Sequence, residues 1–189
     1  MQVEKLEIPE VLLITPKKFG DARGFFSETW VARRYEEIGV TGNFVQDNHS
    51  LSRDKGVIRG LHCQIAPSIQ DKLVRVVRGS IWDVAVDIRQ GSPSFGKHVA
   101  AVLSADNWQQ LWIPGGFLHG FCTLEPDTEV VYKVTAPYDS AAERGITWDD
   151  PDLALPWPIA PEDCTLSPKD AALPRFSAIG DWFQFPGAI

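Results

Sequence analysis

The amino-acid sequence predicts a mainly β protein whose strands form an antiparallel jelly roll or barrel, with a few short helices. Apolar and polar residues alternate in a series of short segments, which is typical of strands buried on one face. Turn sequences such as Asp54-Lys55-Gly56 and Pro114-Gly115-Gly116 separate these segments. A parallel sheet would need a crossover helix between successive strands, and the intervening segments are too short for one. We therefore expect the strands to pair antiparallel.

One helix precedes most of the predicted strands. It is expected at residues 30–38, because Thr29 can cap its N-terminus and Gly39 follows where a helix-terminating glycine is common. The predicted strands are residues 11–15, 43–51, 57–64, 72–78, 80–88, 97–104, 109–114, 118–124 and 128–135.

The segment from about residue 150 onward is rich in proline and is expected to be an irregular tail that wraps the barrel. Within it, Ser167-Pro168-Lys169-Asp170 has an N-cap residue followed by proline, which predicts one short helical turn. The length of 189 residues is typical of one domain. We expect residues 1–189 to form a single domain of the antiparallel jelly-roll or barrel type.

The charge of the chain excludes some partners. Eighteen basic and 25 acidic residues give a net charge of −7, and no basic run offers a grip on nucleic acid or on an anionic membrane. The sequence has no secretory leader pattern and no apolar stretch of membrane-spanning length, so we expect a cytoplasmic protein. The cysteines Cys63, Cys122 and Cys164 lack metal-site spacing, which predicts buried free thiols.

Residues 80–88 place Asp83 and Asp87 on one face of a strand. Because charged residues are seldom buried unless they are paired, we expect both carboxylates to lie in solvent.

A histidine motif bears on metal binding. Pro114-x-Gly116-x-x-His119 matches the second half-motif of cupin barrels, in which this histidine can ligate a metal. The first half-motif requires a His-x-His pair and a nearby Glu, whereas this chain has His62-Cys63-Gln64 without a nearby carboxylate. The ligand set is incomplete, and we expect no bound metal.

Two side chains have complementary proton chemistry. His62 is then free to act as a general base at cellular pH, although a packing role is the commoner one for a single strand histidine. Tyr132 is protonated at neutral pH and can donate a proton, but a core tyrosine would occupy the same position.

Seven segments together resemble one family. They are residues 19–28 (FGDARGFFSE), 44–50 (FVQDNHS), 59–62 (RGLH), 71–76 (DKLVRV), 113–121 (IPGGFLHGF), Tyr132-Lys133 with Tyr138, and 166–170 (LSPKD). In this order they resemble the dTDP-4-dehydrorhamnose 3,5-epimerase family, cupin-fold nucleotide-sugar isomerases that use no cofactor. Because the segments span nearly the whole chain in register, the resemblance is specific.

The resemblance implies a role for each matching residue. His62 would accept the proton, Asp170 would orient His62, Tyr132 would donate the proton, and Lys72 would lie beside the keto oxygen of the sugar. The implied substrate-binding residues are Arg23 and Arg59 at the diphosphate, Glu28, Gln46, Asp47 and Asn48 at the nucleoside, His119 at the sugar, Tyr138 stacked on thymine, and Glu143 and Lys169 at further contacts.

The implied reaction converts dTDP-4-dehydro-6-deoxyglucose to dTDP-4-dehydro-rhamnose for dTDP-rhamnose synthesis. The hydrogens on carbons 3 and 5 both lie α to one carbonyl, and inversion needs a base and an acid on opposite sides of the ring. Arg59 and His62 are three positions apart, so strict alternation would place them on opposite strand faces. We expect a bulge near Gly60 that brings both to one ligand.

Other functions share some of these features. A monofunctional 5- or 3-epimerase would keep all of the residues named, a metal-dependent cupin oxygenase would need further ligands near His62 and His119, and a sugar-nucleotide-binding module would bind without turnover. The resemblance also implies a homodimer in which exchanged N-terminal strands lend Arg23 or Glu28 to the neighbouring site.

Overall fold

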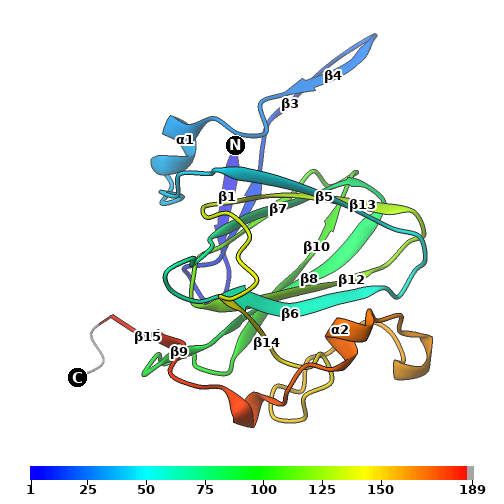
Figure 1. The fold of residues 1–189 in the computed structure, drawn as a ribbon. Helices are drawn as coiled ribbons and strands as arrows, with labels where there is room; N and C mark the ends of the chain where they lie inside the picture. Colours follow the sequence, from blue (N-terminus) through cyan, green and yellow to red (C-terminus); the bar gives the residue numbers. More distant parts are fainter. Residues whose placement is uncertain (187–189) are drawn as a thin grey trace.

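The computed structural model describes residues 1–186 and consists mainly of two antiparallel sheets that face each other (Figure 1). The six-stranded sheet has the order β1 (Gln2–Lys5), β2 (Leu12–Thr15), β11 (Gln110–Ile113), β7 (Lys72–Arg78), β13 (Thr128–Val134) and β5 (Gln46–Ser52). The five-stranded sheet has the order β10 (His98–Ser104), β8 (Ser80–Asp87), β12 (Phe117–Thr123), β6 (Ile58–Gln64) and β14 (Glu143–Gly145). The predicted antiparallel jelly-roll class is confirmed, although the two sheets do not join into a closed barrel.

The main core lies between the two sheets. It combines Val74, Val76 and Val130 from the six-stranded sheet with Ile81 and Phe121 from the five-stranded sheet, all buried. Burial of apolar side chains of this size stabilises the folded state by about 1.5–3 kcal/mol each. This packing fixes the distance between the sheets and so the width of any site between them.

The prediction that Asp83 and Asp87 lie in solvent is wrong. On β8 they share the inward face with Ile81 and Ala85, and both carboxylates are completely buried. Asp87 accepts hydrogen bonds from the side chains of Arg89, Ser92 and Ser94. These partners compensate the Asp87 carboxylate for the loss of hydration, and such hydrogen bonds are what allows a charged group to be buried.

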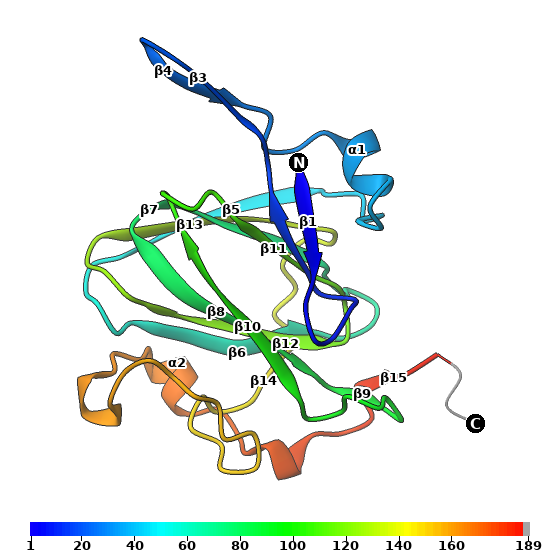
Figure 2. The ribbon, with the colours of Figure 1, turned by 180° about the vertical axis from the view of Figure 1, so that it is seen from behind.

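The proline-rich tail covers the outer face of the five-stranded sheet, as Figure 2 shows below β6 and β8. Its elements are η1 (Pro161–Asp163), α2 (Pro168–Ala171), η2 (Phe176–Ala178) and β15 (Phe183–Gln184), and β15 pairs in parallel with β9 (Arg89–Gln90). Trp157 from the tail contacts Trp82 of β8 at 4.9 Å between ring centroids. The predicted turn at Ser167 is confirmed, since its hydroxyl accepts a hydrogen bond from the amide of Asp170.

Helix α1 (Ala32–Glu36) is shorter than predicted and has Val31 rather than Thr29 at its N-cap. The carbonyl of Thr29 instead accepts hydrogen bonds from the side chains of Tyr35 and Gln110. These contacts fix the segment before the helix against the six-stranded sheet. Gly39 follows the helix with a φ of 94°, as expected of a terminating glycine.

A hairpin that the sequence analysis did not predict projects from the body of the molecule (Figures 1 and 2). It consists of β3 (Lys18–Asp21) and β4 (Gly24–Ser27), and we call residues 18–27 the arm. At its root the indole of Trp108 donates a hydrogen bond to Ser27 and packs edge-on against Phe25. The arm therefore has a fixed starting direction, while its tip contacts solvent.

The remaining predicted strands lie within three residues of the observed bounds, and 72–78 matches β7. Cys63 and Cys122 are buried free thiols as predicted, whereas Cys164 is half-buried. No helix in the described part of the chain has the length and apolar character needed to cross a membrane.

Candidate active site

A pocket of about 210 Å³ lies between the two sheets, on the side where β5 and β14 are the edge strands. Strands β5, β7 and β13 form one wall, and β6, β12 and β14 form the other. Its polar and ionisable lining residues include Gln46, Asn48, Arg59, His62, Lys72, His119, Tyr132, Tyr138 and Glu143. Most of the residues assigned from the family resemblance therefore meet in one cavity.

An irregularity in β6 brings Arg59 and His62 to the same pocket, as predicted. Along β12, Phe121 pairs with Arg59 but His119 pairs with His62, so two residues of β6 oppose Gly120 alone. Gly60 has a φ of 113°, and a side-chain carbon there would lie 2.6 Å from the carbonyl oxygen of His119. Only glycine fits this position, because both the backbone angle and the space exclude a Cβ atom.

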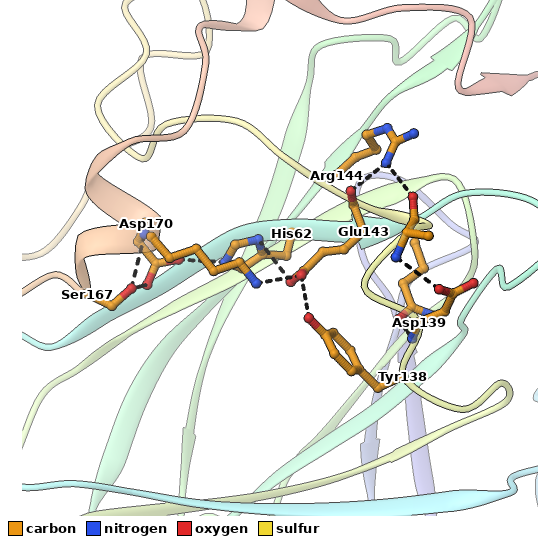
Figure 3. A network of polar contacts seen from close by, with 10 residues as sticks. His62, Tyr138, Asp139, Glu143, Arg144, Ser167 and Asp170 are labelled. Carbon is orange, nitrogen blue, oxygen red and sulfur yellow. Dashed lines mark hydrogen bonds and ion pairs between the residues drawn. The ribbon is translucent and has the colours of Figure 1, made fainter.

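His62 forms a short hydrogen bond with Asp170, with 2.6 Å between Nε2 and Oδ1 (Figure 3). Asp170 belongs to helix α2 of the tail, 108 positions further along the chain, and also accepts a hydrogen bond from the hydroxyl of Ser167. Burial alone would raise the pKa of Asp170, but the hydrogen bonds from His62 and Ser167 outweigh it and lower the pKa. The carboxylate stays charged, so it holds the Nε2 proton of the imidazole.

The other imidazole nitrogen of His62 is the one available for chemistry. Nδ1 is buried and has no hydrogen-bond partner among residues 1–186; Glu143 Oε1 lies 3.7 Å away. With Nε2 protonated, a neutral imidazole carries its lone pair on Nδ1. Nδ1 is therefore the nitrogen that is left to accept a proton.

Glu143 joins His62 to the pocket entrance (Figure 3). Its Oε2 accepts hydrogen bonds from the Tyr138 hydroxyl at 2.8 Å and from the Lys169 ammonium group at 2.5 Å. Partial burial would raise the pKa of Glu143, but these two donors and the nearby His62 lower it. The ring of Tyr138 is 57% exposed, so its face is open to a ligand.

Tyr132 and Lys72 approach the same space from the opposite sheet. They lie on the neighbouring strands β13 and β7, whose pairing aligns Tyr132 with Val74 and Val134 with Lys72. Burial raises the pKa of the Tyr132 phenol, so it is protonated at neutral pH. A proton acceptor on one wall thus faces a proton donor and a cation on the other.

Comparisons with known proteins agree with this geometry. Residues 5–178 match the family model described as dTDP-4-dehydrorhamnose 3,5-epimerase. The chain belongs to this family. It is 53% identical to the dTDP-4-dehydrorhamnose 3,5-epimerase of Shigella flexneri over 90% of this chain and 93% of that protein.

Solved structures of dTDP-sugar epimerases have the same fold. A dTDP-6-deoxy-D-glucose-3,5-epimerase from Legionella pneumophila, crystallised with dTDP-4-keto-L-rhamnose, superposes with a TM-score of 0.93 at 46% identity, covering 97% of this chain and 98% of that chain. A 3′-monoepimerase from Streptomyces bikiniensis with dTDP-quinovose has a TM-score of 0.83 at 29% identity, covering 91% and 86%. The present chain is an isomerase of this epimerase family.

Four residues assigned to the substrate are not among those that line the pocket of this epimerase chain. One of them, Lys169, reaches the lining through its bond to Glu143. Arg23 is on the arm and forms an ion pair with Asp21, and Glu28 follows the arm and pairs with Arg34. Asp47 points to the outer face of β5, where it pairs with Lys133. By contrast, Gln46 bonds to Asn48 at 2.7 Å and to the Tyr138 amide at 3.1 Å, both at the pocket.

One feature of this epimerase site was missed from sequence. His119 Nε2 is hydrogen-bonded to Asp83 Oδ1 at 2.8 Å, forming a second histidine–aspartate pair beside the first, since His119 and His62 are register partners. The sequence contained a signal for this inward position, because alternation along the strand places Asp83 on the same face as the apolar residues Ile81 and Ala85. Within residues 1–186, no group of three or more His, Cys, Asp or Glu side chains is arranged to hold a metal ion.

Proposed function

We propose that this protein catalyses the 3,5-epimerisation of dTDP-4-dehydro-6-deoxyglucose to dTDP-4-dehydro-rhamnose in dTDP-rhamnose synthesis. The observation that carries the proposal is that His62, whose Nδ1 has no hydrogen-bond partner within residues 1–186, and Tyr132 line one pocket from opposite sheets. Inversion at a carbon needs removal of a proton from one side and its return from the other. Two groups on facing walls meet that requirement.

In this mechanism His62 Nδ1 removes the proton α to the keto group. Asp170 holds the imidazole by its Nε2 proton and stabilises the positive charge that the ring gains. Electrons from the broken C–H bond move into the carbonyl, which becomes an enolate oxygen. The ammonium group of Lys72 stabilises this oxygen, and the loss of one such interaction typically costs about 3 kcal/mol of transition-state stabilisation.

Tyr132 then returns a proton to the opposite side of the same carbon. Carbons 3 and 5 flank the carbonyl. After the first inversion His62 releases its proton to solvent and the Tyr132 phenolate takes one up, and a small movement of the ring then brings the second carbon between the two restored groups. The two inversions share one enolate-stabilising group, Lys72, because both pass through the same oxygen.

The nucleotide is assigned to the open end of the pocket. Tyr138 offers an exposed ring for stacking on thymine, and Gln46 and Asn48 offer amide groups to the nucleoside. Arg59 has the planar guanidinium that suits a diphosphate. Lys169 and Glu143 contact the substrate near the entrance, and His119 contacts the sugar.

We propose further that the protein acts in the cytoplasm as a homodimer with exchanged N-terminal strands. Phe25 and Phe26 on the arm are 56% and 65% exposed, and apolar groups of this size on a projecting hairpin favour contact with another chain. In such a dimer the arm brings Arg23 and Glu28 to the neighbouring pocket. Asp47 is assigned to the nucleoside with them.

Hydrogen exchange tests the reaction directly. The protein is incubated with dTDP-4-dehydro-6-deoxyglucose in deuterated water, and label at carbons 3 and 5 is followed by NMR. Label at both carbons with inversion is the expected result, and His62→Ala should abolish it. Label at one carbon alone would show a monofunctional epimerase, and no label with the wild-type chain would reject the proposal.

A further inference from the structure

Asp83 is completely buried at the inner face of β8, and only one of its two carboxylate oxygens is hydrogen-bonded. Oδ1 is hydrogen-bonded to His119 Nε2 at 2.8 Å, whereas Oδ2 has no partner within residues 1–186. An unpaired buried carboxylate oxygen destabilises the folded state. Such an oxygen requires a functional or electrostatic explanation.

Lys72 lines the pocket from the opposite sheet together with His119, is within electrostatic reach of Asp83, and forms no ion pair within 4 Å in the part of the chain described. The ionisable groups that face it are Arg59, His62 and Cys63 from β6, Asp83 from β8, His119 from β12, Tyr132 from β13 and Glu143 from β14. Cys63 is neutral, because burial raises the pKa of its thiol to about 12. Two carboxylates, Asp83 and Glu143, therefore remain as counter-charges.

Only one of these two carboxylates is free to balance Lys72. Glu143 already binds the ammonium group of Lys169 at 2.5 Å. Asp83 has no cation of its own while His119 is neutral, and its Oδ2 is unoccupied. Burial lowers the pKa of Lys72, and the charge of Asp83 opposes that shift.

We propose that Asp83 is a positioning residue with two simultaneous effects: it keeps the Lys72 ammonium group charged, and it holds His119 as the Nε2–H tautomer with Nδ1 as an acceptor toward the sugar. The two carboxylate oxygens divide this work. Oδ1 fixes the ring of His119, and the negative charge that Oδ2 leaves unneutralised acts on Lys72. The inference rests on the proposed function only for its consequence, a lower rate when Lys72 loses its proton.

Asp83→Asn tests the first effect, because the amide keeps the size of the side chain and removes its charge. The titration of Lys72 is followed by NMR of its ¹³Cε and ¹⁵Nζ nuclei, which needs no enzymatic activity. We expect the titration to move to lower pH by about one unit. The fall of the exchange rate at alkaline pH should also move to lower pH. The change in kcat should be larger than the change in KM.

Asp87→Asn is the matched control. Asp87 lies on the same strand and the same face and is equally buried, but it is bonded to Arg89, Ser92 and Ser94 rather than to a residue that lines the pocket. Its substitution should lower stability and leave the Lys72 titration unchanged. A Lys72 titration that stays in place in Asp83→Asn, or that moves equally in Asp87→Asn, would overturn the proposal.

The second effect is tested in the unmodified protein, which keeps the inference testable if Asp83→Asn does not fold. ¹⁵N NMR of the His119 ring should show the proton on Nε2 and not on Nδ1. Finding the Nδ1–H tautomer would reject the assignment. Absence of exchange by the wild-type chain would instead reject the proposed function, and the two failures are therefore distinguishable.

Discussion

At the scale of single residues, the proposed mechanism assigns proton removal and proton return to different residues. His62 and Tyr132 belong to different sheets, so changing one leaves the wall of the other intact. We expect Tyr132→Phe to retain deuterium exchange at the carbon while inversion falls by roughly 10²-fold or more, the usual range for a lost general acid. NMR that separates label incorporation from the stereochemical product checks this. Equal loss of label and inversion would contradict the division of roles.

Asp170 also links the site to stability, and the sign follows from its lowered pKa. A carboxyl group with a depressed folded-state pKa stabilises the protein above its ordinary value of 3.8 and loses that contribution as pH falls through the folded-state pKa. Asp170→Asn should therefore lower the free energy of unfolding by about 1–3 kcal/mol at pH 7. The difference from wild type should shrink below about pH 4.

Denaturant titrations at several pH values measure this difference. Asp149→Asn is the control, because Asp149 lies in the same tail but pairs with Arg175 in an exposed position. Such a surface pair contributes about 0–1 kcal/mol. An Asp170→Asn deficit that did not change with pH would show that the carboxylate is held by packing rather than by charge.

The presence of a residue at the pocket was predictable where its type suits a reaction, as with His62. Its partner was known only through the family resemblance, because 108 positions separate His62 from Asp170 and no local pattern relates them. Asp83 was assigned to solvent because carboxylates are usually exposed. That tendency was given more weight than the alternation along the strand, which places Asp83 on the same face as Ile81 and Ala85. A buried charge is decided by its three-dimensional partners, which single-sequence patterns do not contain.

At the scale of elements, the bulge in β6 brings Arg59 and His62 to the same pocket. Gly60→Ala should destabilise the protein by about 1–3 kcal/mol, since it strains a residue held at positive φ, and should reduce activity by misdirecting His62. Thermal unfolding and the exchange assay measure both effects. Gly20→Ala is the control, because its new Cβ atom would meet nothing closer than 3.7 Å. Equal stability of the two variants would refute the need for glycine at position 60.

Elements with alternating patterns were predicted within a few residues, and the bulge was predicted from the conflict between Arg59 and His62. The arm was not, because its strands carry exposed aromatic residues on both sides and bury none of them. Helix α1 was predicted too long, because the carbonyl of Thr29 is used by Tyr35 and Gln110 rather than by the helix. Local propensity gives way where a tertiary hydrogen bond is available.

At the scale of the whole molecule, exchange of arms can be tested by mixing two defective chains. His62→Ala lacks the base, and Arg23→Ala lacks the arm guanidinium. If arms act on the neighbouring pocket, a mixed dimer contains one site with both an intact His62 and an intact Arg23. We expect co-refolded variants to regain up to about a quarter of wild-type activity, the share of sites expected from random pairing of two chains.

Sedimentation of the same samples establishes whether the refolded chains are dimers. The Arg23→Ala variant refolded by itself is the control, and it should regain no activity. Activity of the mixture no higher than the mean of the separate variants would place Arg23 at the pocket of its own chain and contradict the exchange.

The tail supplies the hydrogen-bond partner of His62. The base sits on β6, but the carboxylate that steadies it arrives on α2, after both sheets have been laid down along the chain. A chain synthesised only as far as β14 therefore contains His62 but not yet its hydrogen-bond partner Asp170. This contact forms only when α2 packs against β6, so it requires the tail to reach the outer face of the five-stranded sheet.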